Sequence, residues 1–286
     1  MYPKYDFLSA SGDLWARCLD DLFNCHRYVS QGRVNPPHYI PCYDFSLTLS
    51  GRVDYDSCGY KLHTDTPLVL LSMPYATFSK HAREDTEYDR YILYAKQELI
   101  DRFAPQVVAM ERLKDANLVW AKPEGRTLKE LTHLMEQFTV TTDNDCAALM
   151  LAVLMRILFS EVDAGRGEIV QMPYPYVNNV LRELDDNMES LPTIGEVCRR
   201  MGVGRTKFQR DFKTVTGIPW HRYLTGIRMK NARELLTDGE SIQDTAMACG
   251  YSTESHFIMA FRKYYGETPG ALIGRGKALK PGNGEK

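Results

Sequence analysis

The sequence lacks any run of apolar residues long enough to span a membrane, for which about 18 are needed. Its N-terminus also lacks the basic-then-apolar pattern of a secretory signal peptide. The cysteines number seven, an odd count, and no two of them form a CxxC pair, so neither a disulfide framework nor a zinc site is predicted. These absences lead us to expect a cytoplasmic protein without a membrane segment.

Enzyme signatures are missing as well. The sequence has no phosphate-binding loop and no plausible serine triad. A cupin-type metal site needs clustered histidines with a glutamate a few residues away, whereas His38, His63 and His81 are isolated from one another. We therefore expect no metal, no cofactor and no enzymatic activity.

One segment has an enzyme-like appearance. Cys25-His26-Arg27 resembles the Cys-His-Arg core of the alkylguanine methyltransferases, in which the cysteine follows a large domain and a proline. Here only 24 residues precede Cys25, and Asn24 occupies the position of that proline. We interpret this match as a coincidence.

Length and charge indicate two parts. A chain of 286 residues, 44% hydrophobic and 25% charged, is long enough for two globular domains of about 150 residues each. Residues 1–170 have 18 Lys and Arg against 24 Asp and Glu, whereas residues 171–286 have 17 against 13. A basic C-terminal part is typical of a polyanion-binding module joined to another domain, although chance partitioning gives the same pattern.

The N-terminal half has the pattern of a β-rich domain between residues 36 and 95. Asp44 to Ser50 alternate polar and apolar residues until Gly51, as in a half-buried strand that enters a turn. Further short strands are expected at Val53–Tyr55, Pro67–Met73 and Arg90–Ala95. Short strands with frequent turn residues indicate a small sandwich or barrel. Residues 1–35 are expected to form an arm with a short helical patch at Leu14–Phe23.

From Leu99 onward the spacing of apolar residues predicts helices. Residues 147–162 are apolar nearly all round, which predicts burial on every side, in a core or against a second subunit. We expect a homodimer, with Leu154 and Leu158 on the interface. The segment from Asp163 to Ile169 has the composition of a flexible break. We place the domain boundary between Gly165 and Pro175, giving domains of residues 1–170 and 171–286.

The C-terminal domain contains an internal repeat. Thr193–Gly202 matches Ser241–Gly250 at an offset of 48, and Phe208–Lys213 matches Phe257–Arg262 at an offset of 49. Each copy begins with an N-cap residue, has an acidic residue three places on, and ends its first helix at a glycine. A short turn and a second helix with two Phe residues four apart follow in each copy.

This repeated pattern of cap residues, glycines and phenylalanines predicts two helix-turn-helix units, at residues 193–216 and 241–265. Each would place its second helix in the DNA major groove. A single copy would fit a plain helical hairpin equally well. Two copies with matching glycine and phenylalanine positions favour helix-turn-helix units. Together with the β-rich N-terminal half, they predict an α+β protein with an all-α C-terminal domain.

Residues 176–273 resemble the C-terminal domain of the AraC family of transcription activators. The resemblance rests on Phe208 to Lys213, Gly217, Arg228, Ser241-Ile242, Gly250-Tyr251, Phe257 to Lys263 and Gly266-Glu-Thr-Pro269. It implies two units at either end of a connecting helix, here about 219–236, that contact successive major-groove segments of double-stranded DNA. It also implies RNA polymerase as a partner. The chain departs from the family pattern at Met259, where arginine is usual, and at Trp220, where proline is usual.

The candidate DNA contacts follow from the second helix of each unit. Six basic residues lie within fifteen positions of the first unit, with only Asp211 opposing them. A solvated helix face would show the same charge, but cations on a recognition helix neutralise phosphates and can bind guanine. The predicted contacts in the first unit are Arg205, Thr206, Lys207, Gln209 and Arg210. Those predicted in the second unit are Glu254, Ser255 and Ile258.

The N-terminal domain resembles the cupin-like sensor barrel of the sugar-responsive branch of this family, over Asp44 to Gly51, Leu62, Leu68 to Leu71, Pro74 and Tyr91 to Tyr94. That resemblance implies a small effector, often a sugar, inside the barrel and dimerisation through adjoining helices. Strand parity places four candidate effector contacts on one face, namely Asp44, Ser46, Thr48 and Ser50. Four more are expected near the mouth, namely Phe78, Lys80, His81 and Arg90. Each of these residues fits an ordinary exposed polar position as well.

The sequence therefore predicts a DNA-binding transcription regulator that activates in response to a small-molecule effector such as a saccharide. The alternative is a regulator of the same fold that has lost its ligand and is controlled by abundance or by a protein partner.

Overall fold

The computed structural model describes residues 21–38, 40–65, 67–107, 110–187 and 191–278. The chain divides into two compact units, one of residues 1–179 with 214–217 and the other of residues 180–213 with 218–286. The predicted boundary at residue 170 lies at the end of the last strand, and the units divide a little later, within a helix.

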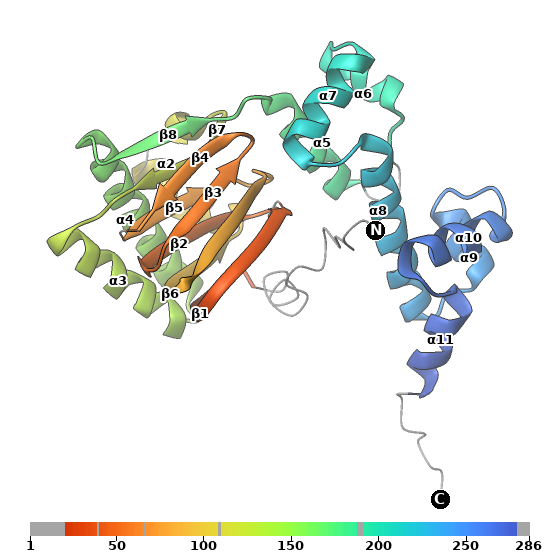
Figure 1. Ribbon diagram of the computed structural model, residues 1–286, viewed down its shortest axis with the longest axis horizontal. Coiled ribbons are helices and arrows are strands. Elements are labelled where there is room, and N and C mark those ends of the chain that lie inside the picture. Colours follow the sequence, from red (N-terminus) through yellow and green to blue (C-terminus); the bar gives the residue numbers. More distant parts are fainter. Residues whose placement is uncertain (1–20, 39, 66, 108–109, 188–190, 279–286) are drawn as a thin grey trace, which may run out of the picture. The chain divides into compact units, whose positions relative to one another are not determined.

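The first unit is a nearly closed antiparallel barrel with helices against one face (Figure 1). Its strands are β1 (Phe23–His38), β2 (Tyr43–Ser50), β3 (Val53–Ser57), β4 (Tyr60–Thr64), β5 (Leu68–Ser72), β6 (Phe78–Ala95), β7 (Ala116–Ala121) and β8 (Gly167–Gln171). Its helices are α2 (Gln97–Val107), the short 3-10 helix η1 (Met110–Leu113), α3 (Gly125–Val140) and α4 (Asn144–Asp163). The strand order is β4-β3-β6-β2-β5-β7-β8, with β1 paired to β6.

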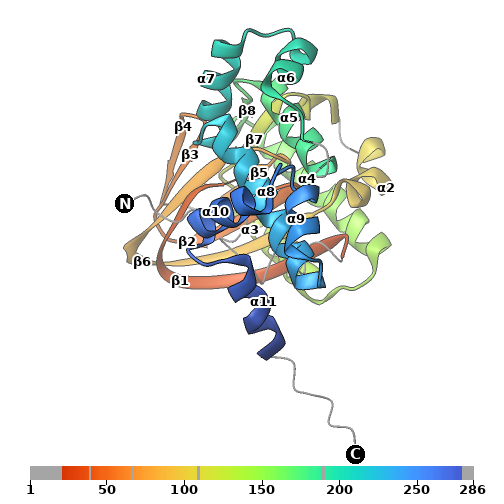
Figure 2. The same cartoon turned by 90° about the vertical axis from the view of Figure 1, so that its right-hand side faces the viewer.

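The long strands β1 and β6 run antiparallel along the barrel (Figure 2). Residues 23–35 were expected in an arm, and this expectation is wrong because they pair with β6 from Phe23↔Ala95 onward. Of the predicted helical patch at 14–23, residues 14–20 lie outside the described residues, and Phe23 begins β1. The expected break at 163–169 is also corrected, because Gly167–Gln171 forms β8 against β7.

The two faces of the sheet differ in character. Odd-numbered residues of β2, such as Phe45 and Leu47, join Leu71 and Leu93 in a hydrophobic core that α3 and α4 complete. Even-numbered residues of β2 point the other way, because successive side chains of a strand alternate. That second face is the interior of the barrel.

The structure corrects the assignment of Leu154 and Leu158 to a subunit interface. Both are essentially fully buried in the core between α4 and the sheet. The apolar residues that α4 leaves exposed are Leu149 and Val153, at 52% and 48%. An all-round apolar helix therefore divides its surface between the core and solvent.

The second unit is helical, and Figure 1 shows its helix pairs at either end of a long central helix. The helices are α5 (Pro175–Asp186, which begins in the first unit), α6 (Ile194–Met201), α7 (Arg205–Thr216), α8 (Trp220–Asp238), α9 (Ile242–Ala248), α10 (Glu254–Tyr265) and α11 (Pro269–Ala278). The pairs α6–α7 and α9–α10 coincide with the two predicted units. The central helix is α8.

The start and end signals in the repeated segment lie where the sequence predicted them. The Thr193 side chain accepts a hydrogen bond from the Glu196 amide, and the Glu196 carboxylate accepts one from the Thr193 amide, which completes a capping box. Ser241 accepts from the Asp244 amide at 3.0 Å in the second unit. Gly202 adopts a φ of 64° at the end of α6, a left-handed conformation that glycine takes without strain.

Aromatic rings pack on the inner face of each second helix. Phe208 and Phe212, one turn apart on α7, both meet the ring of Trp220 on α8 edge-on, at centroid distances of 5.2 and 5.1 Å. On α10, Phe257 and Phe261 pack edge-on against each other, at 5.7 Å. The inward phenylalanines fix which face of each second helix remains exposed.

Candidate DNA-binding surface and barrel interior

The outward face of α7 is polar and largely basic. All five predicted contacts on this helix are exposed, namely Arg205, Thr206, Lys207, Gln209 and Arg210. The opposite face contains Phe208 and Phe212, both fully buried. The structure therefore gathers the predicted contacts of the first unit on one accessible surface.

One carboxylate organises the cations on this surface. Asp211 is fully buried, and its carboxylate accepts hydrogen bonds from Lys207 Nζ at 2.5 Å and from Arg210 Nε at 3.1 Å. The Lys207 and Arg210 side chains remain 50% and 69% exposed. A buried carboxylate needs such partners, because an unpaired charge inside a protein is costly. Asp211 thus restrains two of the cations that we predict to meet DNA.

The helix that precedes α7 adds further positive charge. Arg199 and Arg200 lie in the last turn of α6 and are exposed. Arg200 is paired with Glu183 of α5 at 2.7 Å. Cations in the last turn also interact favourably with the helix dipole. They therefore stabilise α6 and can also attract a polyanion.

The second recognition helix has a different exposed face. Glu254 and Ser255 are exposed as predicted, whereas Ile258 is half-buried and packs against the core around Phe257 and Phe261. The outward positions also include Met259, which is 69% exposed, and the exposed His256, Arg262 and Lys263. Sequence analysis did not select His256, although its place beside the inward Phe257 could have indicated it.

The barrel interior contains most of the predicted effector residues. Asp44, Ser46 and Thr48 are buried on one face of β2, as strand parity predicted. Lys80 and Arg90 are also buried, at 2% and 5% exposed. On β6 they share parity with Tyr88, and the register pairs Arg90 with Thr48 and Lys80 with Tyr55. These side chains therefore line one polar surface inside the barrel.

The contacts of the two buried cations are mostly aromatic. Lys80 Nζ donates to the Tyr88 hydroxyl at 3.1 Å and lies over the Tyr55 and Tyr88 rings. The Arg90 guanidinium lies over Tyr28 and Tyr88, at 5.9 and 5.4 Å from the ring centroids. Aromatic faces attract cations through their quadrupoles. Sequence analysis missed these tyrosines, because their common parity emerges only from the strand pairing.

Three predicted effector residues lie elsewhere or differ in character. His81 is exposed, because it follows Lys80 on β6 and consecutive residues of a strand point to opposite faces. Ser50 is exposed at the end of β2, where its hydroxyl donates to the Glu87 carbonyl. Phe78 is buried in a small apolar cluster with Ile40 and Cys42.

Several polar atoms in the barrel interior have no hydrogen-bond partner among the described residues. They include Asp44 Oδ1, Ser46 Oγ, Ser72 Oγ and Arg90 Nε. Burial raises the pKa of Asp44 to about 6, and the nearby Arg90 opposes this shift without cancelling it. Buried polar groups are normally paired, so these atoms mark a place where a polar molecule can supply partners.

In the described part of the chain, the metal-ligating side chains are dispersed and Cys25 is packed against the protein. No group of three or more His, Cys, Asp or Glu side chains there is arranged to hold a metal ion. Cys25 is half-buried and its thiol contacts the Met135 carbonyl oxygen. Burial raises the pKa of this thiol to about 12, so it is not a thiolate nucleophile at neutral pH.

None of the described helices combines the length and apolarity needed to cross a membrane.

Comparison with known proteins agrees with the helix-turn-helix geometry. Residues 197–275 match the family described as "Helix-turn-helix domain". The chain is 27% identical over 143 residues to the HTH-type transcriptional activator RhaS of Escherichia coli O139:H28 (strain E24377A / ETEC). This match covers 50% of the chain and 51% of the relative, so the chain spans about half the length of the curated relatives it matches. These relatives are described as HTH-type transcriptional activators.

Solved structures show the same two-part fold. ToxT from Vibrio cholerae has a TM-score of 0.50 and 13% identity, and the likeness covers 88% of this chain and 98% of that one. ToxT of strain O395 bound to (E)-4-(8-methylnaphthalen-1-yl)but-3-enoic acid has the same score and identity, with coverage of 90% and 100%. At this identity the likeness supports the fold alone.

Proposed function

We propose that this member of the AraC family of transcription regulators activates transcription by placing α7 and α10 in successive major-groove segments of DNA. The observation that carries the proposal is the outward face of α7. Five exposed polar side chains lie there, opposite two fully buried phenylalanines, in the second helix of a capped helix-turn-helix unit. Activation is proposed because the RhaS relatives bear the description of transcriptional activators.

The spacing of the two units suits this mode of binding. The connecting helix α8 has 19 residues, which at about 1.5 Å per residue makes it about 28 Å long. One turn of B-DNA rises about 34 Å, so units at the two ends of α8 lie close to one helical turn apart. In our proposal Arg205, Thr206, Lys207, Gln209 and Arg210 contact DNA from the first unit. Glu254 and Ser255 do so from the second unit, with Ile258 supporting the helix from its inner side.

We further propose that the barrel is a sensor and that its interior binds a small polar effector, a saccharide being one candidate. Unpaired polar atoms on Asp44, Ser46 and Ser72 support a ligand there, since hydroxyl groups could satisfy them. Effector binding would shift the equilibrium between forms that present α7 and α10 differently to DNA. The alternative is a regulator controlled by abundance or by a protein partner, and calorimetric titration with saccharides, both neutral and acidic, separates the two.

The proposal includes a homodimer and RNA polymerase as partners. The exposed Leu149 and Val153 lie one turn apart on α4 and offer an apolar strip for a second copy of the chain. We therefore propose Leu149 and Val153 as the interface in place of Leu154 and Leu158, which belong to the core.

The test of DNA binding uses the full chain and a pool of random duplexes. Rounds of selection should enrich a site with two contacted segments about one helical turn apart. Fluorescence anisotropy on the selected duplex should then show affinity that falls steeply with salt, with a log–log slope of about 0.9 per phosphate contact. The proposal would be contradicted if no sequence is enriched, or if the affinity for the duplex does not change with salt concentration.

A further inference from the structure

The barrel interior holds two buried cations that have no carboxylate within ion-pair distance among the described residues. Lys80 and Arg90 are 2% and 5% exposed. Both cations contact neutral aromatic side chains, namely Tyr28, Tyr55 and Tyr88. Burial of an unpaired cation is expensive, and aromatic contacts recover only part of that cost.

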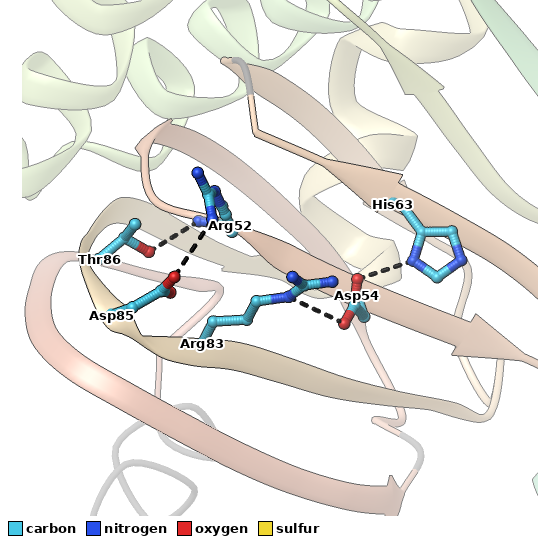
Figure 3. A network of polar contacts seen from close by, with 6 residues as sticks. All are labelled: Arg52, Asp54, His63, Arg83, Asp85 and Thr86. Carbon is cyan, nitrogen blue, oxygen red and sulfur yellow. Dashed lines mark hydrogen bonds and ion pairs between the residues drawn. The ribbon is translucent and has the colours of Figure 1, made fainter.

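The outer surface of the same barrel is built differently. Figure 3 shows Arg52 paired with Asp85, and Asp54 between His63 and Arg83. The Arg52–Asp85 distance is 3.2 Å, and Asp54 lies 2.7 Å from His63 and 3.6 Å from Arg83. All of these side chains except the half-buried Asp54 are exposed and could be solvated without any partner, yet they are paired. On the exterior, cations are paired with carboxylates although such pairs contribute little to stability. In the interior, where an unpaired charge is most costly, Lys80 and Arg90 have no carboxylate partner among the described residues.

Asp44, the one buried carboxyl that the described residues place on the interior face, does not neutralise both cations. Asp44 lies near Arg90 but forms no ion pair with it, and burial raises the pKa of Asp44 to about 6. His26 adds no third charge, because burial and the charge of Arg90 lower its pKa. The other buried carboxylates of this unit are occupied, Asp89 by Arg27 and Glu161 by Arg166. Even with Asp44 ionised, the interior face therefore retains a net positive charge.

Polar groups suited to hydroxyls lie on the same interior face. Ser46 Oγ, Ser72 Oγ and Asp44 Oδ1 are buried and have no hydrogen-bond partner among the described residues. The register places Asp44 directly opposite Ser72, and Ser46 two residues further along β2. Serine hydroxyls both donate and accept, and a carboxylate oxygen accepts, so the three can bind neighbouring hydroxyl groups of one small molecule.

We propose that the barrel interior binds a small hydroxylated carboxylate, with Lys80 and Arg90 as the partners of its carboxylate group. Asp44, Ser46 and Ser72 bind its hydroxyl groups, and Tyr88, which both cations contact, forms an apolar wall. This inference rests on the proposed effector site and names its ligand class: an organic anion rather than a neutral sugar. Charge, more than hydroxyl stereochemistry, then separates ligands from non-ligands.

The first test compares matched pairs of small molecules on the full chain. D-glucuronate, D-galacturonate and lactate are set against D-glucose, D-galactose and 1,2-propanediol, which have the same skeletons without the carboxylate, at equal ionic strength. We expect at least one acid to raise the melting temperature and to bind by calorimetry, and its neutral counterpart to do neither. Equal effects of acid and neutral partner, or no effect of any acid, would overturn the inference. Hexanoate is included, because binding of hexanoate as tight as that of the best hydroxy acid would refute the role of Asp44, Ser46 and Ser72.

The second test asks whether Lys80 serves the ligand or the fold. Lys80→Met keeps an apolar side chain of similar length, and Lys61→Met, on the exposed face of β4, is the matched control. We expect Lys80→Met to keep or raise the ligand-free melting temperature and to weaken acid binding at least about 30-fold. Lys61→Met should change neither. A large fall in the ligand-free melting temperature would make Lys80 a structural residue and overturn the proposal. Arg90→Gln, which keeps hydrogen-bond donors but no charge, should weaken acid binding in the same way, and unchanged binding would count against it.

A third measurement keeps this inference apart from the proposed function. Anisotropy on the selected duplex is recorded for the same variants without acid, and Lys80→Met should bind DNA as the unaltered chain does. If the protein binds acid in a Lys80-dependent way but does not bind DNA, the proposed regulator function is refuted and the ligand inference stands. If the protein binds DNA but no acid, the ligand inference is refuted and the regulator function stands.

Discussion

Lys207 donates from Nζ to the fully buried carboxylate of Asp211, 2.5 Å away and one helical turn further along α7. Arg210, the residue immediately before Asp211, donates to the same carboxylate from Nε. Two long flexible side chains on the exposed face are therefore restrained by a group on the inner side of the helix. Because free lysine and arginine side chains lose substantial rotamer entropy on binding, this restraint lowers the cost of meeting DNA.

Asp211→Asn should separate placement of these cations from their charge. The amide has the shape of the carboxylate but no charge, so Lys207 and Arg210 are held less firmly while the net charge of α7 rises by one. We expect binding to an unrelated duplex to become tighter and the preference for the selected site to fall about tenfold. Anisotropy titrations on both duplexes measure this ratio. Glu240→Gln, between α8 and α9, removes one exposed negative charge outside the proposed DNA contacts and releases no cation of α7, so it should leave the preference largely intact. An unchanged preference in Asp211→Asn would mean that the carboxylate only stabilises the helix.

The helical unit was predictable because its signals are local. The caps at Thr193 and Ser241, the glycine at Gly202 and the phenylalanines at i and i+4 lie within a few residues of the helix ends they define. Strand parity likewise placed Asp44, Ser46 and Thr48 correctly on one buried face. What a pattern encodes over five to ten residues could be obtained from the sequence alone.

The errors arose where the outcome depends on distant partners. β1 is defined by its pairing with β6, some 60 residues later, and no local signal marks it. Both Lys80 and His81 were selected as effector contacts, although adjacent strand residues cannot share a face, and the pairing of Lys80 with Tyr55 decides between them. For α4, uniform apolarity gave no indication of which face meets the sheet. The aromatic surroundings of Lys80 and Arg90 required the whole register of the barrel.

Replacement of both Leu149 and Val153 by Glu should convert a dimer into monomers. These side chains are exposed in the single chain, so charges there cost the fold little, whereas buried at an interface they would repel. Light scattering coupled to size-exclusion chromatography measures the mass. Val140→Glu, at the exposed end of α3, is the control and should remain dimeric. Leu154→Glu should unfold the protein instead, because that residue is in the core. A monomeric unaltered chain would refute the α4 interface.

Asp44→Asn should stabilise the barrel above about pH 6 and have little effect near pH 4. Burial raises the pKa of Asp44 in the folded protein from 3.8 to about 6. The free energy of unfolding therefore falls as the pH rises from about 4 to about 6, between the pKa of the unfolded chain and that of the folded protein, by about 3 kcal/mol in all. Asn stays neutral and escapes this loss. Urea denaturation at pH 5 and pH 8 measures the gain, which should be larger at pH 8. A gain independent of pH in Asp44→Asn would contradict the assignment.

The two recognition helices should contribute unequally to DNA binding. The exposed face of α7 combines Lys207 and Arg210 with Arg205, whereas the centre of the exposed face of α10 is Met259, which is 69% exposed. Methionine can contact a thymine methyl group but attracts no phosphate. We expect Arg210→Ala to cost about 1–3 kcal/mol and, if Arg210 binds a guanine, to relax the preference at one base pair. Met259→Ala should cost less than about 0.5 kcal/mol, as surface substitutions commonly do. Both variants are titrated on the same selected duplex by anisotropy, and circular dichroism confirms that each remains helical. Equal losses, or a larger loss for Met259→Ala, would make α10 the principal reading helix.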